Sequence, residues 1–359
     1  MRILLTGAGS LVARGIHDAL AGRGSGVELI GANMDPRDPT ALLCSRVHPL
    51  PPDSQPAALR EGIASVAAAE KPDLVIPCRD PHIGILAELQ DAGELTGKAP
   101  LGPAALARIM VDKWEAHNWC IPRQIPFAPS VLAGQQDTME AIDRLIAAHG
   151  LPLIAKPRAG SGSLGVRVIH DWGQAERASQ ISGLVFQPFL DPPPDSSLRI
   201  DMSIGTPLFW EAPGTRNFGG QFLIGPGGEL GPGMQVYASQ RLGRNESCGQ
   251  GHDEALQAIM TRATALFAAA GWRGPLTIQA RPHHGQWYIT DFGGRFGGGT
   301  SQRRWLGLDE VGWIVNAWAG RVVVPPPDGP PATFVARHLA DTPVWQTPAG
   351  ASLFPHPRS

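Results

Sequence analysis

Residues 152–166 read Pro-Leu-Ile-Ala-Lys-Pro-Arg-Ala-Gly-Ser-Gly-Ser-Leu-Gly-Val. We expect a short apolar strand that ends at Lys156, and a second strand over residues 166–169. The loop between them carries Gly160, Ser161, Gly162, Ser163 and Gly165. Glycine lets backbone N–H groups turn toward an anion, and the serine hydroxyls add donors. Because Lys156 contributes a positive charge beside this loop, the segment predicts a binding site for a polyphosphate.

Composition limits the classes of function. The chain has 359 residues and a formal net charge of −2, which argues against a nucleic-acid partner bound by phosphate neutralisation. No apolar run approaches the roughly 18 residues that span a bilayer, and the N-terminus reaches glycine too soon for a signal peptide. Four scattered cysteines without C-x-x-C spacing predict neither a zinc site nor a disulfide framework. We therefore expect a cytoplasmic protein with no membrane partner.

Short strands and helices alternate at the start of the chain. Strands are expected over residues 2–6, 27–33 and 73–77, and helices follow the first strand and cover about 55–70 and 81–92. This alternation predicts a doubly wound parallel sheet, so the fold class is α/β. We expect this lobe to end near residue 97.

Further elements are expected beyond residue 97. They are helices over 112–119, 138–148 and 254–270, and strands over 184–187, 197–204, 274–280 and 286–291. A loop dense in glycine is expected over 214–233, and the proline run at 325–331 is interpreted as a surface linker. His283 and His284 are expected in an exposed hairpin turn.

The turn after the first strand carries Gly7 and Gly9, as dinucleotide-binding motifs do, and Asp35 follows the second strand. Val12 occupies the third glycine position, so a tight turn that borders a substrate anion is favoured over NAD binding. An NAD-dependent oxidoreductase stays open as an alternative.

Several motifs of the second half occur in a fixed order. Lys113 opens a helix, Lys156 precedes the glycine loop, and residues 185–190 read Val-Phe-Gln-Pro-Phe-Leu. Gln279 lies on a later strand, and residues 289–299 read Ile-Thr-Asp-Phe-Gly-Gly-Arg-Phe-Gly-Gly-Gly. In this order they resemble the ATP-grasp superfamily, in particular the branch of carbamoyl phosphate synthetase large chains and the pyrrolysine-pathway ligase. The resemblance covers residues 1 to about 320.

The resemblance implies an ATP-grasp fold with four parts. Residues 1–97 would form the preceding Rossmann-like lobe, and 98–185 the linker helices and a small lid lobe. Residues 186–324 would form the large lobe, and 325–359 a Pro-rich C-terminal tail.

It also implies contacts to ATP. Lys113 and Lys156 correspond to two lysines that contact phosphates. The lid loop over the β- and γ-phosphates corresponds to Ser161, Gly162, Ser163 and Gly165. The hinge that reads adenine corresponds to Gln187, Phe189 and Leu190. The ribose carboxylate is assigned to Asp195, with Ser197 and Asp201 as competitors.

Gln279 and Asp291 correspond to metal positions, for which Mg²⁺ is expected and Mn²⁺ is the alternative. Arg295 corresponds to an arginine that neutralises phosphate during transfer, so Arg295 and Lys156 are the catalytic candidates. The family usually has Glu-x-Asn where this chain has Asp291-Phe-Gly293. The shorter carboxylate and the missing asparagine predict weaker metal binding, or a further ligand from elsewhere.

Fewer sequence features indicate the residues of the substrate pocket than those of the ATP site. Asp80 and His82 follow the third strand, where the carboxyl ends of a parallel sheet face ligand. The full set of substrate candidates is Gly9, Asp80, His82, Arg199, Arg216 and Gly298.

The implied activity is ATP-dependent carboxylate–amine ligation through an acyl phosphate, with release of ADP and phosphate. The substrates would be amino acids or other small metabolites, and the family expectation is a homodimer. Two alternatives share the fold: a nucleotide-binding protein with weak or no ligase activity, and a carboxylase or carbamoylating enzyme that uses bicarbonate.

Overall fold

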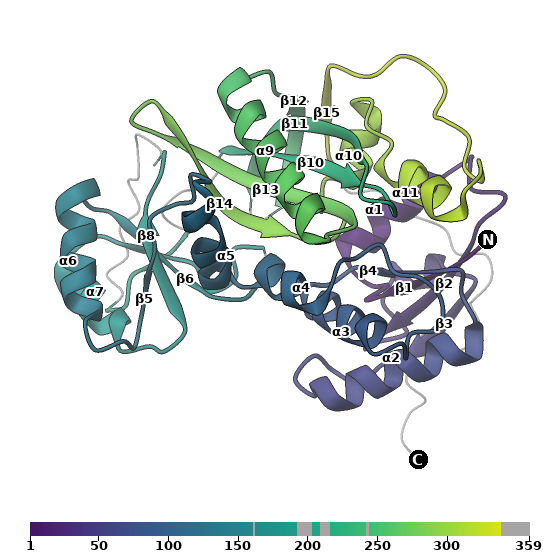
Figure 1. The fold of residues 1–359 in the computed structure, drawn as a ribbon, viewed down its shortest axis with the longest axis horizontal. Coiled ribbons are helices and arrows are strands. Elements are labelled where there is room, and N and C mark those ends of the chain that lie inside the picture. Colours follow the sequence, from purple (N-terminus) through teal and green to yellow (C-terminus); the bar gives the residue numbers. More distant parts are fainter. Residues whose placement is uncertain (161, 192–202, 209–215, 242–243, 339–359) are drawn as a thin grey trace.

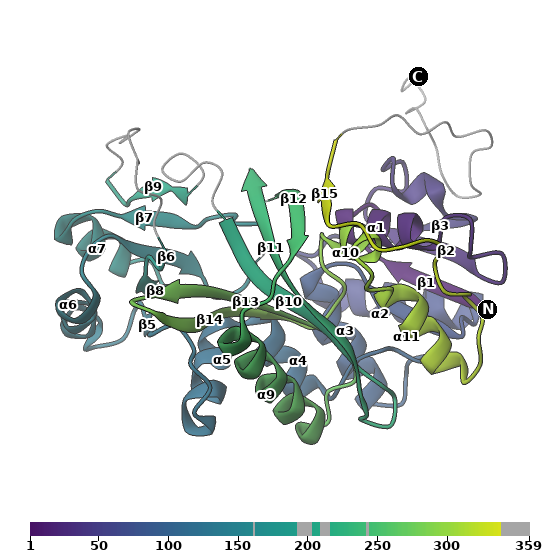
Figure 2. The ribbon, with the colours of Figure 1, turned by 90° about the horizontal axis from the view of Figure 1, so that it is seen from above.

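Three β-sheets organise the protein (Figures 1 and 2). The structure is a computed structural model that describes residues 1–160, 162–191, 203–208, 216–241 and 244–338. Ser161, Asp195, Ser197, Arg199 and Asp201 lie outside the described residues, and with them most of the strand expected over 197–204. None of the described helices is long and apolar enough to cross a membrane.

The first lobe is a parallel sheet in the order β3-β2-β1-β4, which confirms the doubly wound α/β prediction. Its strands are β1 (Arg2–Thr6), β2 (Glu28–Asn33), β3 (Arg46–Pro49) and β4 (Leu74–Pro77). Its helices are α1 (Leu11–Leu20), η1 (Ala41–Leu43), α2 (Pro56–Glu70) and α3 (Asp80–Asp91). Ile3 and Leu5 pack on the side of α1, whereas Leu4 packs with residues of α2 and α3, so both faces of the sheet are covered.

The small lobe is an antiparallel sheet in the order β5-β8-β6-β7-β9. Its strands are β5 (Val131–Leu132), β6 (Leu153–Pro157), β7 (Arg167–Ile169), β8 (Leu184–Pro188) and β9 (Thr206–Pro207), and its helices are α6 (Thr138–His149) and α7 (Trp172–Ser179). The boundary expected at residue 185 falls inside β8, and β9 also belongs to this sheet. The small sheet therefore continues beyond the expected limit.

The large lobe is an antiparallel sheet in the order β14-β13-β10-β11-β12-β15. Its strands are β10 (Arg216–Ile224), β11 (Leu230–Arg241), β12 (Arg244–Gln250), β13 (Gly274–His283), β14 (Gln286–Gly293) and β15 (Phe334–Ala336). Its helices are α9 (Glu254–Ala270), α10 (Thr300–Trp305) and α11 (Glu310–Ala319). Helices α4 (Ala104–Val111) and α5 (Lys113–Cys120) and the short helix η2 (Ile121–Arg123) connect the lobes.

Two expectations about this lobe were wrong. The glycine-dense segment expected as a loop forms β10 and the start of β11. Its glycines permit close packing: a Cβ on Gly219 would lie 2.3 Å from the Ile278 carbonyl oxygen, and one on Gly233 would lie 2.2 Å from the Phe222 ring. The segment expected as a Pro-rich tail contributes β15, which pairs with β12.

The first and large lobes share apolar cores, whereas the small lobe has its own. One cluster joins α2 and α3 to α4, α5, α9 and the large sheet, and in it Trp119 stacks on Phe267 at 4.0 Å between ring centroids. A second joins β1 and α1 to α11. A third lies entirely within residues 131–186 of the small lobe. The first and large lobes therefore form one packed body, to which the small lobe is attached as a separate unit.

Candidate nucleotide and substrate site

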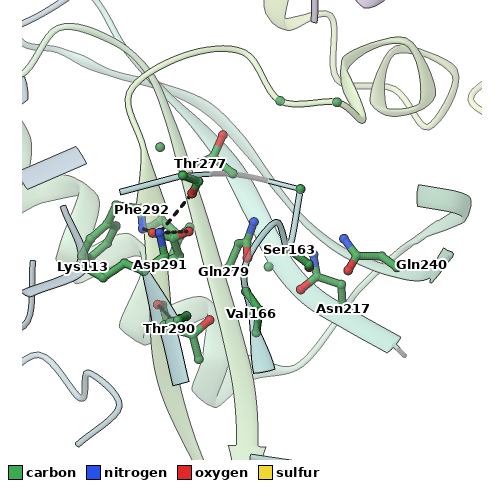
Figure 3. Close-up of a pocket in the computed structure, with 18 of the residues that line it drawn as sticks. Lys113, Ser163, Val166, Asn217, Gln240, Thr277, Gln279, Thr290, Asp291 and Phe292 are labelled. Atoms are coloured by element: carbon green, nitrogen blue, oxygen red, sulfur yellow. Dashed lines mark hydrogen bonds and ion pairs between the residues drawn. The ribbon is translucent and has the colours of Figure 1, made fainter. Parts of the chain in front are cut away.

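A cavity of about 300 Å³ lies where the three lobes meet (Figure 3). Residues from α3, α5, β6, β8, β10, β11, β13 and β14 line it, together with the glycine loop after β6. Twelve of the residues predicted from the sequence are among them: Lys113, Lys156, Gly162, Ser163, Gln187, Phe189, Leu190, Gln279, Asp291, Arg295, Asp80 and Gly298. One cavity thus brings together candidates that lie far apart in the sequence.

Two lysines from different elements enter this cavity. Lys113 begins α5, and its position is fixed because the Asp112 side chain caps the helix by accepting from the backbone N–H groups of residues 114 and 115. Lys113 Nζ donates to the Gly160 carbonyl oxygen at 3.1 Å and lies 3.8 Å from Asp291 Oδ2. Lys156 projects from β6 and donates to the Thr290 carbonyl oxygen of the large lobe at 3.0 Å.

The charged form of Lys156 is disfavoured in the protein without a ligand, because the side chain is buried. The side chain is 8% exposed. Burial, with smaller contributions from the charges of Lys113 and Arg281, lowers the pKa of Lys156 to about 7, while Asp291 opposes the shift. A bound polyanion would favour the protonated form again. The site is therefore suited to a ligand with concentrated negative charge.

The loop after β6 has the backbone conformation that its glycines predict. Gly160, Gly162, Ser163 and Gly165 all have positive φ, at 130°, 65°, 59° and 75°. At Gly165 a Cβ would also lie 2.9 Å from Pro157 Cγ. Arg158 anchors the start of the loop through an ion pair with Asp112 at 2.7 Å. The loop is therefore held beside Lys113, and Gly160, Gly162 and Ser163 line the cavity.

The cavity also has an apolar wall. Ile154, Val166, Phe189, Leu190, Leu208 and Ile278 line it. Gln187 is 3% exposed, and its Nε2 donates to Ser130 Oγ at 2.8 Å, so this side chain is already engaged within the small lobe. The wall suits a flat apolar ligand group such as an adenine ring.

Gln279 and Asp291 face each other on adjacent strands. They are register partners in the β13–β14 ladder, beside an irregularity between residues 279 and 280. Asp291 Oδ1 accepts from the backbone N–H of Phe292 at 3.1 Å, which orients the carboxylate. No group of three or more His, Cys, Asp or Glu side chains suited to a metal occurs among the described residues. One carboxylate and one amide oxygen fit Mg²⁺, which retains waters and takes phosphate oxygens as further ligands.

Arg295 links the large lobe to the first lobe. Its Nε donates to Asp80 Oδ1 at 2.7 Å, and one Nη donates to the Phe296 carbonyl oxygen at 2.9 Å. Asp80 is the first residue of α3, directly after β4, so the parallel sheet delivers it to this edge. The Arg295 side chain is 16% exposed and lines the cavity.

Other candidates lie elsewhere. A Cβ on Gly9 would lie 2.5 Å from the Asp38 carboxyl carbon, and Gly9 does not line the cavity. His82 does not line it either: it hydrogen-bonds Asp53 at 3.3 Å, and this contact, with Arg79, lowers the pKa of Asp53 to about 2. Gly165 packs against Pro157 and does not line the cavity, and Arg216, the first residue of β10, is not among the lining residues either.

Sequence reasoning missed several polar residues of the cavity. They are Asn217, Gln240, Arg244, Asn245, Thr277, Arg281 and Arg303. Arg281 follows Gln279 by two positions on one strand, so alternation of side chains would have found it. Burial lowers the pKa of Arg281 to about 10. Asn217 and Gln240 lie on β10 and β11, and the expectation of a loop hid the face that Asn217 occupies.

No family model matches the chain. A formate-dependent phosphoribosylglycinamide formyltransferase of Burkholderia cenocepacia (strain HI2424) is 28% identical over 170 residues. That match spans 47% of this chain and 39% of the relative, so less than half of the relative's length is covered.

Solved structures resemble the chain over most of its length. An N5-carboxyaminoimidazole synthetase from Staphylococcus aureus complexed with ADP has a TM-score of 0.64 and 12% identity, over 93% of this chain and 79% of that one. An L-amino acid ligase from Bacillus licheniformis has a TM-score of 0.60 and 16% identity, over 88% and 74%. The biotin carboxylase domain dimer of a Hydrogenobacter thermophilus 2-oxoglutarate carboxylase, in complex with MgADP, ADP and bicarbonate, has a TM-score of 0.65 and 14% identity. The match covers 89% of this chain and 70% of that one. These neighbours are ATP-grasp enzymes, so this chain has the ATP-grasp fold.

Proposed function

We propose that the protein is an ATP-dependent carboxylate–amine ligase that forms an amide or peptide bond and releases ADP and phosphate. One observation carries this proposal. Lys113, Lys156 and the glycine loop line a single cavity together with Gln279, Asp291 and Arg295. Cationic donors and oxygen ligands that converge on one space are what transfer of a phosphoryl group requires.

ATP would lie between the small and large lobes. The apolar wall would hold the adenine, and the two lysines with the loop amides would bind the phosphates. Asp291 and Gln279 would hold Mg²⁺, or Mn²⁺ in its place. When bound, this ion supplies positive charge that neutralises the phosphate oxygens and orients the γ-phosphate. The ADP and MgADP complexes of the structural neighbours support this assignment.

In the reaction, an oxygen of the substrate carboxylate attacks the γ-phosphorus, and the bond to the β,γ-bridging oxygen breaks to release ADP. The product is an acyl phosphate. The amine nitrogen then attacks the acyl carbon, the bond to the phosphate oxygen breaks, and the amine loses a proton. Lys156 and Arg295 would stabilise the charge on the transferring group, because both are cationic side chains that line the cavity.

The separate core of the small lobe supports a closing motion. Acyl phosphates react with water, so the cavity must exclude solvent while the intermediate exists. The small lobe can move without disrupting the core that the first and large lobes share. The contact of Lys156 with Thr290 crosses this boundary and would be exchanged for a contact with phosphate.

The experiment is a screen for ADP release with MgATP and small acids and amines, singly and in pairs. The proposal expects ADP only when an acid is present, and an amide product when the matching amine is added. Nucleotide binding without ADP release under every combination would contradict it, and would favour a binding protein without ligase activity.

A second candidate is a bicarbonate-using carboxylase or carbamoylating enzyme. It is favoured by the carboxyaminoimidazole synthetase and the bicarbonate complex among the neighbours. ADP release that depends on added bicarbonate in degassed buffer, without any other acid, would select this candidate. A homodimer remains the expected assembly under either candidate, and light scattering would test it.

A further inference from the structure

One end of the cavity is built by the hairpin of β11 and β12 and by residues 297–299. Gln240, Arg244 and Asn245 line it from the hairpin. Gln240 Nε2 donates to Asn245 Oδ1 at 3.1 Å, which orients the Asn245 amide. A Cβ on Gly299 would lie 3.3 Å from Asn245 Nδ2, so the glycine permits this close approach. The result is a surface of N–H donors next to the glycine turn.

Positive charge accumulates at this end. Arg303 is almost completely buried, but Glu310 pairs with it at 2.8 Å. Arg337 donates to the Gly298 carbonyl oxygen at 2.6 Å, and its other terminal nitrogen is buried without a partner. Among the described residues no carboxylate forms an ion pair with Arg244 or Arg337. This end of the cavity therefore carries positive charge that the described part of the chain leaves uncompensated.

The neighbouring arginines also disfavour one another. Burial lowers the pKa of Arg337, Asp18 and Cys248 oppose this shift, and Arg244 and Arg303 add smaller lowering effects. Like charges held together in a partly buried place are stabilised when an anion lies between them. Arg241 and Arg244 face each other across the hairpin and both are solvent-exposed, but among the described residues only Arg241 pairs with a carboxylate, that of Glu246 at 3.8 Å.

We infer that Arg244 and Asn245 bind a second anionic group, a carboxylate or a phosphate, carried by the substrate acid. This inference rests on the proposed ligase function, since it concerns the acid that would be phosphorylated. The planar guanidinium of arginine suits both groups, because it can donate two parallel hydrogen bonds. One carboxylate of the acid would face Arg295 and the γ-phosphate, and the second anionic group would face the hairpin.

The test is calorimetric titration of acids into the protein saturated with MgADP. The probes are L-aspartate, L-glutamate, succinate and O-phospho-L-serine, each matched with a neutral or singly charged counterpart: L-asparagine, L-glutamine, butyrate and L-serine. We expect at least one doubly anionic probe to bind about tenfold or more tightly than its counterpart. Equal affinities within every pair, or no binding of any doubly anionic probe, would overturn the inference. The O-phospho-L-serine arm distinguishes a phosphate from a carboxylate.

Arg244→Gln tests the assignment to residues, and Arg241→Gln is the matched control on the same hairpin. Arg244→Gln should remove the preference for the doubly anionic probe and leave the affinity for MgADP unchanged. Arg241→Gln should retain both the preference for the doubly anionic probe and the affinity for MgADP. If both variants lose the preference equally, or neither does, the assignment to Arg244 is wrong.

The proposed function fails in a different way. If MgADP binds but no acid elicits ADP release, the ligase proposal fails, and the titrations still decide whether this end of the cavity prefers anions. If singly charged acids are ligated as well as doubly charged ones, the ligase proposal stands and this inference fails.

Discussion

The two ends of the cavity are assembled in different ways. At the nucleotide end, Lys113, Lys156 and the glycine loop come from one segment of the chain, residues 113–190, with metal candidates supplied by one hairpin. At the acceptor end, Leu11, Asp80, Arg244 and Gly298 come from four separate segments. Local sequence motifs therefore specify the nucleotide end, whereas only the packing of the first lobe against the large lobe creates the acceptor end.

The largest expected effect comes from a substitution at the nucleotide end of the cavity. Lys156→Met removes one of the two lysines that line the cavity, so ADP release should fall by about 10²–10³-fold. Steady-state kinetics with MgATP and the acid found in the screen measure this loss. Lys98→Met alters an exposed lysine of the first lobe and should keep full activity. Comparable activity in both variants would remove Lys156 from the reaction.

The next largest effects are expected from substitutions at the contact between Arg295 and Asp80. Arg295→Gln should lower kcat by about 10²-fold, since it removes charge that stabilises the transferring phosphoryl group. Asp80→Asn should cost about tenfold, because it weakens the 2.7 Å contact that positions Arg295 without removing the arginine.

For Asp80→Asn the loss should fall on kcat and not on the KM for ATP. A rise in the KM for the amine alone would instead indicate that Asp80 binds the amine substrate. Arg321→Gln, at an exposed arginine remote from the cavity, serves as the control.

A smaller effect concerns the metal. Asp291→Asn removes the only carboxylate of the candidate pair, so the Mg²⁺ concentration for half-maximal ADP release should rise by about tenfold. Titration of Mg²⁺ at saturating ATP measures the shift. An unchanged Mg²⁺ dependence would show that the ion is held by other residues.

The smallest expected effect is the uptake of a proton by Lys156 when nucleotide binds. The pKa of Lys156 is about 7 in the free protein, so at pH 8 most molecules hold a neutral lysine. Bound phosphates raise this pKa, so binding of MgADP at pH 8 should take up part of a proton, and affinity should fall as pH rises above 7. Calorimetry in buffers of different ionisation enthalpy measures the uptake, which Lys156→Met should abolish. Binding without proton uptake in the unmodified protein would mean that Lys156 is already charged.

The contrast between the two ends also explains what the sequence could predict. The strand, lysine and glycine loop at residues 152–166 are contiguous, so the local pattern was enough to predict them. The order of later motifs predicted Gln279, Asp291 and Arg295 in the same site. The acceptor end depends on register and packing between lobes, which no local pattern encodes. The expectation of a loop over 214–233 hid Asn217 on β10, because the glycines there serve close contacts such as that of Gly233 with Phe222. Arg244 lies on β12, a strand that no local pattern predicted.

The same reason accounts for the misplaced limits of the lobes. Residues 184–188 alone indicate a strand, but not which sheet it joins. Hydrogen bonding with β6 assigns it to the small lobe. Likewise, residues 334–336 form a strand only because β12 offers an edge.

Transfer of oxygen from acid to phosphate tests the central claim most directly. The acid identified in the screen is labelled with ¹⁸O in its carboxylate and incubated with the protein, MgATP and the amine. Mass spectrometry of the products then follows the label. An acyl phosphate predicts one ¹⁸O in the inorganic phosphate for each amide formed. Amide formed alongside unlabelled phosphate would contradict the account.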